Sequence, residues 1–221
     1  MASSIKKLIK RVIGREGYAI LVNTKLGSKL HDTLHSDSPT SRDFLLQILP
    51  KFSTGLEIGV NDGDFSERIL EIVRPKKLHL IDPWEFSNDP KYSASPYGSQ
   101  RVDGPNMMNE KYNNVKKRFS DLIDKNRVAI HKGFSENLCN TFDDSYFDWI
   151  YIDGNHCYEF VKNDLTLYFP KVKSGGLISG DDYYPDDLSG DGVKRAVDEF
   201  VSTGNTKLIQ IKHHQFILQK L

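Results

Sequence analysis

The sequence has 221 residues with 30 basic and 30 acidic side chains, so its formal net charge is zero. This length suits one large domain, and the balanced charge argues against a general electrostatic attraction to nucleic acid. The two cysteines, Cys139 and Cys157, make neither a disulfide framework nor a CxxC zinc motif, which favours a reducing, cytoplasmic location. No apolar run approaches the ~20 residues that span a bilayer, and no secretory signal follows the early lysines.

The amino-terminal part is basic and amphipathic. Over residues 5–21, isoleucine, leucine and valine recur at helical spacing between lysines and arginines. We expect a helix that packs on the domain, over its site or against a second subunit in a homo-oligomer; peripheral contact with an anionic membrane is the less favoured alternative. A second, short helix is expected over 43–49, ending at Pro50. We therefore assign residues 1–50 to a helical extension and 51–221 to the main domain.

The stretch from Leu56 to Ser66 places two glycines, Gly59 and Gly63, between an apolar run and a helical pattern. This order predicts a strand, a tight turn and a helix. Glycine allows a ligand to approach the main chain closely, and the start of a helix offers unpaired N–H groups to a polar or anionic group. The turn could equally be structural, so it needs support from elsewhere in the chain.

That support comes from residues 77–82, a short apolar strand that ends in Asp82, 19 residues after Gly63. An acidic residue at about this spacing accepts hydrogen bonds from ribose hydroxyls in nucleotide sites. The alternative is an aspartate that caps a helix or faces solvent. Because the glycine turn lacks the G-x-G-x-x-G pattern, a nucleoside without a diphosphate fits better than NAD.

Strands and helices alternate along the rest of the chain. The pattern predicts an α/β fold, a Rossmann-like, mostly parallel seven-stranded sheet with helices on both faces and an antiparallel carboxy-terminal edge hairpin. We expect that hairpin, with His213 and His214, to lie far from the site. The polar segment 85–108 follows Asp82 directly and is expected to be a lid or an acceptor-binding loop. Expected strands are 55–60, 77–82, 127–131, 147–152, 176–180, 206–212 and 214–219, and expected helices are 64–73, 109–124, 158–169 and 191–202.

Three acidic residues follow two further predicted strands: Asp153 after one, and Asp181 and Asp182 after the other. Ligands of open α/β sheets bind beyond the carboxyl ends of the strands, so these residues should converge there. Clustered like charges are unfavourable unless they are protonated or bridged by a cation. Oxygen ligands suit a hard ion, which predicts Mg²⁺ or another divalent cation, although one or two of the acids could instead cap helices.

The run Tyr151–His156, followed by Tyr158 and Asp164 and then by Gly175–Tyr183, resembles the class I S-adenosylmethionine-dependent methyltransferases. The resemblance covers about residues 50–220. It is closest to the metal-dependent O-methyltransferases that modify macrolide and aminocoumarin sugars.

The resemblance implies a role for each matching residue. Glu57, Gly59 and Gly63 would form the loop beside the methionine part of S-adenosylmethionine, with Ser66 near its carboxylate. Asp82 would hold the ribose, Gly133–Ser135 would lie near adenine, Asp153, Asp181 and Asp182 would hold the metal, with Asp153 also beside the cofactor, and His156 would be a general base.

Methyl transfer needs an acceptor hydroxyl that is held in line and partly deprotonated, which a bound metal and a neutral imidazole can provide. Either His156 or Asp153 could take the proton, and His156 could instead be a structural histidine that caps the next helix. We expect a sugar or small-molecule hydroxyl as the acceptor. A hydroxylase-like relative and a non-catalytic cofactor-binding or scaffold protein are the alternatives; an Fe(II) oxygenase would usually need two histidines and one carboxylate.

Overall fold

The computed structural model describes residues 42–87, 104–185 and 190–221. The expected helix within residues 5–21 lies outside these ranges, as does most of the predicted lid. The proposed division at residue 50 therefore stays a prediction.

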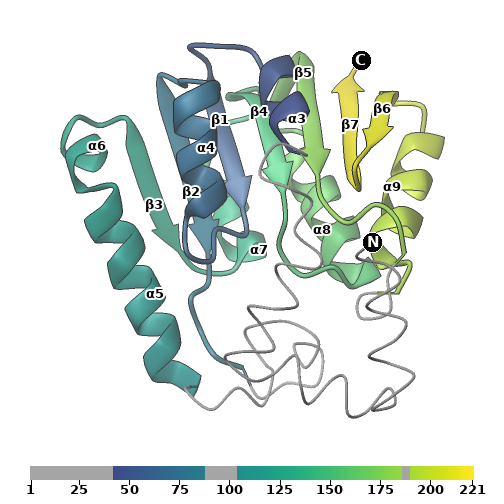
Figure 1. The fold of residues 1–221 in the computed structure, drawn as a ribbon. Helices are drawn as coiled ribbons and strands as arrows, with labels where there is room; N and C mark the ends of the chain where they lie inside the picture. Colours follow the sequence, from purple (N-terminus) through teal and green to yellow (C-terminus); the bar gives the residue numbers. More distant parts are fainter. Residues whose placement is uncertain (1–41, 88–103, 186–189) are drawn as a thin grey trace, which may run out of the picture.

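The described residues form one seven-stranded sheet with the order β3-β2-β1-β4-β5-β7-β6 (Figure 1). The strands are β1 (Thr54–Ile58), β2 (Lys77–Asp82), β3 (Val128–Lys132), β4 (Phe147–Ile152), β5 (Val172–Gly180), β6 (Thr206–Lys212) and β7 (Gln215–Lys220). Strands β1 to β5 are parallel to one another, and β7 pairs antiparallel with both β5 and β6. This arrangement confirms the predicted fold class, including the antiparallel edge.

Helices cover both faces of the sheet, as expected for strands that are joined by crossover connections (Figure 1). One face carries α3 (Asp43–Ile48), α4 (Asp64–Ile72), α5 (Gly104–Arg118) and α6 (Ser120–Asp124); the other carries α7 (Ser135–Leu138), η2 (Cys139–Thr141), α8 (Tyr158–Tyr168) and α9 (Gly192–Ser202).

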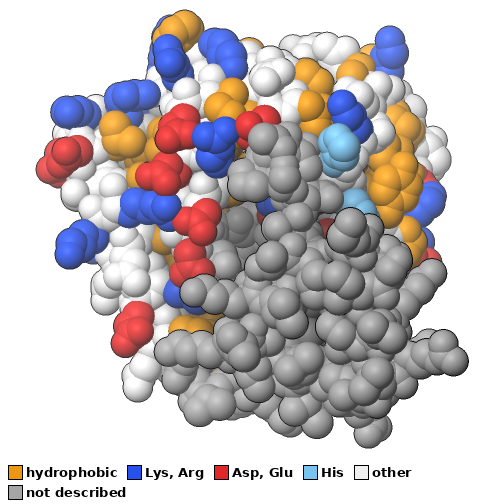
Figure 2. Space-filling model, viewed as in Figure 1, with side chains coloured by type: hydrophobic (Ala, Val, Ile, Leu, Met, Phe, Trp, Pro, Cys, Tyr) orange, Lys and Arg blue, Asp and Glu red, His pale blue; other side chains and the backbone are white. Residues whose placement is uncertain are grey.

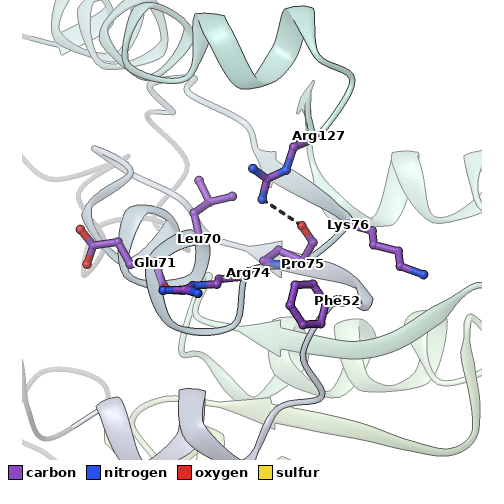
Figure 3. Close-up of a pocket in the computed structure, with 7 residues that line it drawn as sticks. All are labelled: Phe52, Leu70, Glu71, Arg74, Pro75, Lys76 and Arg127. Carbon is purple, nitrogen blue, oxygen red and sulfur yellow. Dashed lines mark hydrogen bonds between the residues drawn. The ribbon is translucent and has the colours of Figure 1, made fainter.

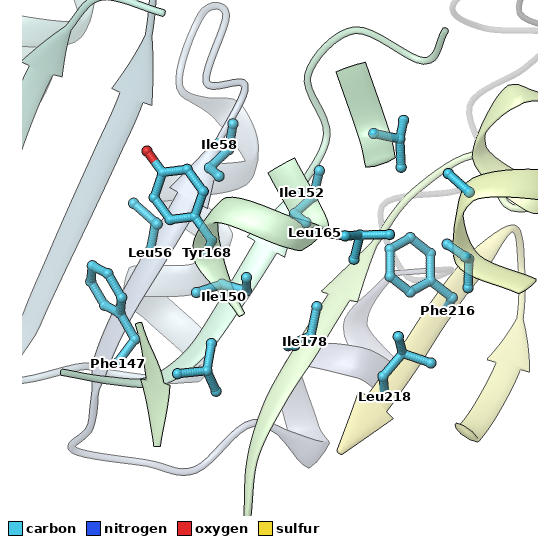
Figure 4. Close-up of a cluster of buried hydrophobic side chains, with 14 of the residues drawn as sticks. Leu56, Ile58, Phe147, Ile150, Ile152, Leu165, Tyr168, Ile178, Phe216 and Leu218 are labelled. Atoms are coloured by element: carbon cyan, nitrogen blue, oxygen red, sulfur yellow. The ribbon is translucent and has the colours of Figure 1, made fainter. Parts of the chain in front are cut away.

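Each face has its own apolar core. Under α8, side chains of the central strands pack against Leu165 and Tyr168 (Figure 4). Val197 of α9 belongs to the same cluster. On the opposite face, Leu45 and Leu46 of α3 and Ile69 of α4 are fully buried. Alternate residues of a strand point to opposite faces, so the same strands supply both cores. The short helix expected over 43–49 is thereby confirmed as α3.

The single helix expected over 109–124 is wrong, because the chain forms two helices, α5 and α6, that meet at Phe119. Phe119 leaves the helical conformation, with φ −105° and ψ 13°, and only 3% of it is exposed. Burial of a large aromatic side chain favours this turn over helix continuation.

The β6–β7 hairpin exists, but its predicted position far from the site is wrong. His213 and His214 form its turn, with φ of 51° and 63°. The carbonyl of His214 accepts a hydrogen bond from the N–H of Tyr183 at 2.8 Å, immediately after Asp182. Because β7 runs antiparallel to β5, its first residues lie where β5 ends.

Acidic and basic side chains alternate over α4 and α5 on the surface of the molecule (Figure 2). Arg118 of α5, for example, contacts Asp64 at 2.6 Å and Glu67 at 2.8 Å. Across the described ranges, no helix is both long and apolar enough to cross a bilayer.

Candidate active site

The turn between β1 and α4 requires glycine at Gly59. Its φ is +90°, and a Cβ added there would lie 2.0 Å from the backbone oxygen of Asp153. Any other residue would combine an unfavourable backbone conformation with a backbone clash. Gly63 also has a positive φ, 81°, and caps α4. Because Gly59 has no side chain, the turn after β1 can pack directly against the end of β4.

Asp82 organises this turn from the end of β2. Its Oδ2 accepts hydrogen bonds from the N–H groups of Val60 and Asn61, both at 2.9 Å, and its Oδ1 accepts one from Trp84 N–H at 2.8 Å. The predicted ribose residue thus also holds the glycine turn in shape.

Glu57 and Ser66 lie beneath the turn and not in the pocket described below. Ser66 donates from Oγ to Glu57 Oε2 at 2.5 Å, and the two residues are 0% and 1% exposed. Burial raises the pKa of Glu57 to about 8. The structure therefore gives this predicted pair a supporting position below the loop.

A small pocket opens beside the turn, at the carboxyl ends of β1, β2 and β4 and the starts of α7 and α8. Three of the predicted cofactor residues, Gly59, Asp82 and Ser135, line it together. Its remaining lining is mostly apolar and comprises Ile58, Ile81, Pro83, Phe134, Gly154, Asn155, Phe160 and Asp164.

Next to this pocket, the end of β4 and the end of β5 bring Asp153, His156 and Asp182 together. His156 Nε2 lies 3.3 Å from Asp153 Oδ1, and its Nδ1 lies 2.8 Å from Asp182 Oδ2. Each residue offers one ligand atom, and these three atoms lie within 4.8 Å of one another. Among the described residues, this is the group with the spacing of a metal site.

Both ring nitrogens of His156 face carboxylates. Burial alone would lower its pKa, but the hydrogen bonds to Asp153 and Asp182 raise that pKa well above the usual value. The N-cap residue of α8 is Cys157, and its N–H donates to Asn155 Oδ1 at 3.0 Å. The ring of His156 therefore belongs to the acidic cluster and does not cap the helix.

Asp181, predicted as a third metal ligand, points elsewhere. It is 4% exposed, and its Oδ1 accepts hydrogen bonds from Asp182 N–H at 2.8 Å and from Gln215 Nε2. Its Oδ2 forms an ion pair with Arg42. Asp182 has a φ of 56°, and this left-handed backbone separates the two adjacent carboxylates.

Arg42, just before α3, is a site residue that the sequence analysis missed. Its Nη1 donates to Asp153 Oδ2 at 3.1 Å while Nη2 pairs with Asp181, and the guanidinium lies 5.3 Å from the ring centre of Phe65. Burial alone would raise the pKa of Asp153, but Arg42 and His156 hold it below its usual value. No local motif marks Arg42, because its partners come from β4 and β5.

Gln215, at the start of β7, was also missed. It is fully buried, and besides holding Asp181 it accepts a hydrogen bond from the Tyr151 hydroxyl at 2.9 Å. A polar residue at the first position of a buried strand is a weak signal in the sequence, and only the pairing of β7 with β5 gives it these partners.

Another cavity lies at the opposite edge of the sheet, near the amino ends of β1 and β2 (Figure 3). Phe52, Leu70, Arg74 and Arg127 line it, and Arg127 donates to the carbonyl of Pro75 at 3.3 Å. None of the predicted site residues lies there, and ligands of this fold class bind at the carboxyl ends of the strands.

Residues 56–183 match the profile of a methyltransferase domain family, which covers more than half of the chain. The chain therefore belongs to the methyltransferase domain family, and the protein is a methyltransferase. A search among curated protein sequences returned no match.

Solved methyltransferase structures share the fold at low sequence identity. A candidate caffeoyl-CoA O-methyltransferase from Staphylococcus aureus has 14% identity and a TM-score of 0.58, with 100% of this chain and 99% of that chain covered. SMU.1697c from Streptococcus mutans, a candidate methyltransferase in complex with SAH, has 15% identity and a TM-score of 0.53, with 82% and 96% covered. A SAM-dependent methyltransferase from Aquifex aeolicus has 14% identity and a TM-score of 0.53, with 87% and 96% covered.

Proposed function

We propose that the protein transfers a methyl group from S-adenosylmethionine to a hydroxyl of a sugar or small molecule, with a divalent cation at the acidic cluster. One observation carries this proposal. The segment after β4 contributes to both sites, since Gly154 and Asn155 line the small pocket while Asp153 and His156 belong to the acidic cluster. A nucleoside in the pocket would thus lie beside groups that can hold and deprotonate an acceptor.

The pocket suits the nucleoside part of the cofactor. Asp82 would accept from the ribose hydroxyls, the segment from Gly133 to Ser135 would lie by the adenine, and the β1 turn at Gly59 would face the methionine part. S-Adenosylmethionine supplies the methyl group on its sulfonium and leaves as S-adenosylhomocysteine, the ligand present in the Streptococcus mutans structure.

The acidic cluster fits a divalent cation such as Mg²⁺ through its two carboxylates, which lie with His156 in a group whose ligand atoms are within 4.8 Å of one another. Asp153 and Asp182 would be its ligands, and Asp181 could join them only by leaving Arg42. Such an ion lowers the pKa of a bound hydroxyl and fixes its position. A cation held by Asp153 and Asp182 would offset the two carboxylates that keep His156 protonated. The neutral imidazole, or Asp153, would then take the acceptor proton.

Two other functions agree less well with this cluster. An Fe(II) hydroxylase would usually need two histidines and one carboxylate, whereas the cluster has one histidine and two aspartates. A scaffold protein would not need the combination of a pocket and an adjoining acid–base cluster. A cytoplasmic location, a homo-oligomer and the absence of a nucleic-acid partner belong to the same proposal.

The proposal is tested by calorimetry with S-adenosylhomocysteine and by a screen of hydroxyl acceptors with labelled cofactor, with and without EDTA. We expect cofactor binding in both conditions and turnover only without EDTA. Absence of cofactor binding would remove the whole proposal. Full turnover in EDTA would remove the metal alone and leave His156 or Asp153 as an unassisted base.

A further inference from the structure

Asp164 of α8 is a buried acid that the proposed reaction does not yet use. It is 5% exposed, and it lines the small pocket together with Asp82. Its Oδ1 accepts a hydrogen bond from Ser135 Oγ at 2.5 Å. Its Oδ2 has no hydrogen-bond donor among the residues that the structure describes.

Asp164 Oδ2 lies beside another residue that lines the pocket, since a Cβ added at Gly154 would lie 3.8 Å from it. The hydroxyl of Tyr168 on the same helix has another acceptor, since it donates to the carbonyl of Ser135 at 2.8 Å. This bond secures the turn after β3, so Ser135 stays in place to orient the carboxylate.

A hydrogen-bond donor from a ligand would stabilise the ionised form of Asp164, which burial disfavours. Burial, partly opposed by the hydrogen bond from Ser135 and aided by the nearby Glu136, raises the pKa of Asp164 to about 7. Oδ2 is not one of the fully buried side-chain atoms that lack a partner, so a hydrogen-bond donor that enters the pocket can reach it. The pocket therefore favours a ligand that brings an N–H or O–H group to Oδ2.

The two acids of the pocket can each bind a different part of a nucleoside. Asp82 comes from β2 and Asp164 from α8, so they approach the pocket from different elements. If Asp82 takes the ribose hydroxyls, the base lies toward Ser135 and Asp164. Adenine presents an exocyclic amine, a hydrogen-bond donor, whereas a 6-oxo purine presents an acceptor at the same position.

We propose that Asp164, oriented by Ser135, accepts a hydrogen bond from the exocyclic amine of the cofactor's adenine and makes the pocket select adenine over a 6-oxo purine. The inference rests on the proposed cofactor. It assigns a base-recognition role to an acid on α8, in addition to the residues that follow β3.

The test compares S-adenosylhomocysteine with its deaminated analogue, S-inosylhomocysteine, by calorimetry at pH 8. We expect the unmodified protein to prefer the adenine ligand by about 100-fold, because the analogue would set a carbonyl oxygen against a carboxylate. In Asp164→Asn, the amide can still accept from Ser135 and can now donate to the 6-oxo group. The preference should fall to less than about fivefold, with weaker adenine binding and stronger inosine binding.

Glu159→Gln, on the exposed side of the same helix, is the matched control and should keep the full preference. Equal weakening of both ligands in Asp164→Asn would mean a structural pair with Ser135 and would overturn the inference. So would a lack of preference in the unmodified protein, a measurement that needs no variant to fold. If neither ligand binds the unmodified protein, the proposed cofactor itself fails, a result distinct from binding without preference.

Discussion

Arg42 Nη1 donates a hydrogen bond to Asp153 Oδ2 at 3.1 Å, although 111 residues separate the two in sequence. The same guanidinium pairs with Asp181, so the chain itself supplies one cation to the group of acids. Asp153 Oδ1 remains directed toward His156. Arg42 therefore offsets part of the charge that would otherwise attract a metal ion, and it competes with that ion for Asp153.

Replacing this cation should have opposite effects on folding and on metal binding. In Arg42→Met, the free energy of unfolding in EDTA should fall by about 1–2 kcal/mol, less than for a fully buried pair because the arginine side chain is 35% exposed. Affinity for Mg²⁺ should rise by about tenfold, since a competing cation is gone. Urea unfolding and calorimetry measure the two effects. Arg195→Met, at an exposed pair, should change neither, and the same result for Arg42→Met would contradict the competition.

Removing one proposed metal ligand should separate metal binding from cofactor binding. Asp182→Asn should lower Mg²⁺ affinity by at least about tenfold and reduce turnover as strongly as EDTA does. Affinity for S-adenosylhomocysteine should change less than about threefold, because Asp182 does not line the small pocket. Calorimetry with each ligand measures this, with the exposed Asp143→Asn as control. A normal rate in Asp182→Asn would refute the metal mechanism.

His156→Ala tests the base. We expect the rate to fall by roughly 10²–10⁴-fold if His156 takes the acceptor proton. Metal should be retained through Asp153 and Asp182, so Mg²⁺ affinity should change less than about threefold. His213→Ala, in the exposed hairpin turn, serves as the histidine control. An unchanged rate in His156→Ala would move the base role to Asp153, and a loss of metal would make His156 a ligand.

The buried Glu57 should make stability depend on pH. Burial raises its pKa to about 8 in the folded state, from the ordinary value of 4.5, so between these values the folded protein binds more protons than the unfolded chain. Stability contributed by this group is therefore present at low pH and is lost as pH rises toward 8. The free energy of unfolding of Glu57→Gln, relative to that of the unmodified protein, should rise by about 1–3 kcal/mol between pH 5 and pH 8. Urea unfolding at both pH values measures this difference.

The exposed Glu110→Gln is the control, and its stability relative to the unmodified protein should stay constant over the same pH range. If Glu57→Gln also shows a constant difference, Glu57 is ionised in the folded state and its bond from Ser66 outweighs its burial.

Gly59→Ala should disrupt the turn, because a Cβ there would lie 2.0 Å from the backbone of Asp153. Gly204 has a similar φ, +77°, with nothing within 4 Å of an added Cβ. Gly204→Ala should therefore lower the free energy of unfolding by only about 1–2 kcal/mol, the effect of a side chain on a left-handed backbone. Gly59→Ala should lower it by at least about 3 kcal/mol and abolish cofactor binding. Urea unfolding compares them directly. Equal costs for the two variants would show that the approach to Asp153 does not matter.

Several features followed from the sequence because they depend on local pattern and strand direction. Apolar runs separated by helical periods predicted the parallel sheet. The φ requirement of a tight turn is local, so Gly59 and Gly63 could be recognised. Asp82, Asp153 and Asp182 could be placed at one edge because the carboxyl ends of parallel strands meet there.

Other features depended on contacts between distant elements. Arg42 reaches the acids because the apolar residues of α3 pack against the sheet. The residues near Arg42 in the sequence do not indicate where on the sheet α3 packs. Gln215 and the hairpin turn reach the site because β7 pairs with β5. Asp181 and Asp182 are adjacent in sequence, but a left-handed backbone at Asp182 directs one toward Arg42 and the other toward His156. Strand order and side-chain direction are set by packing, so only the tertiary structure decided which carboxylates face one another.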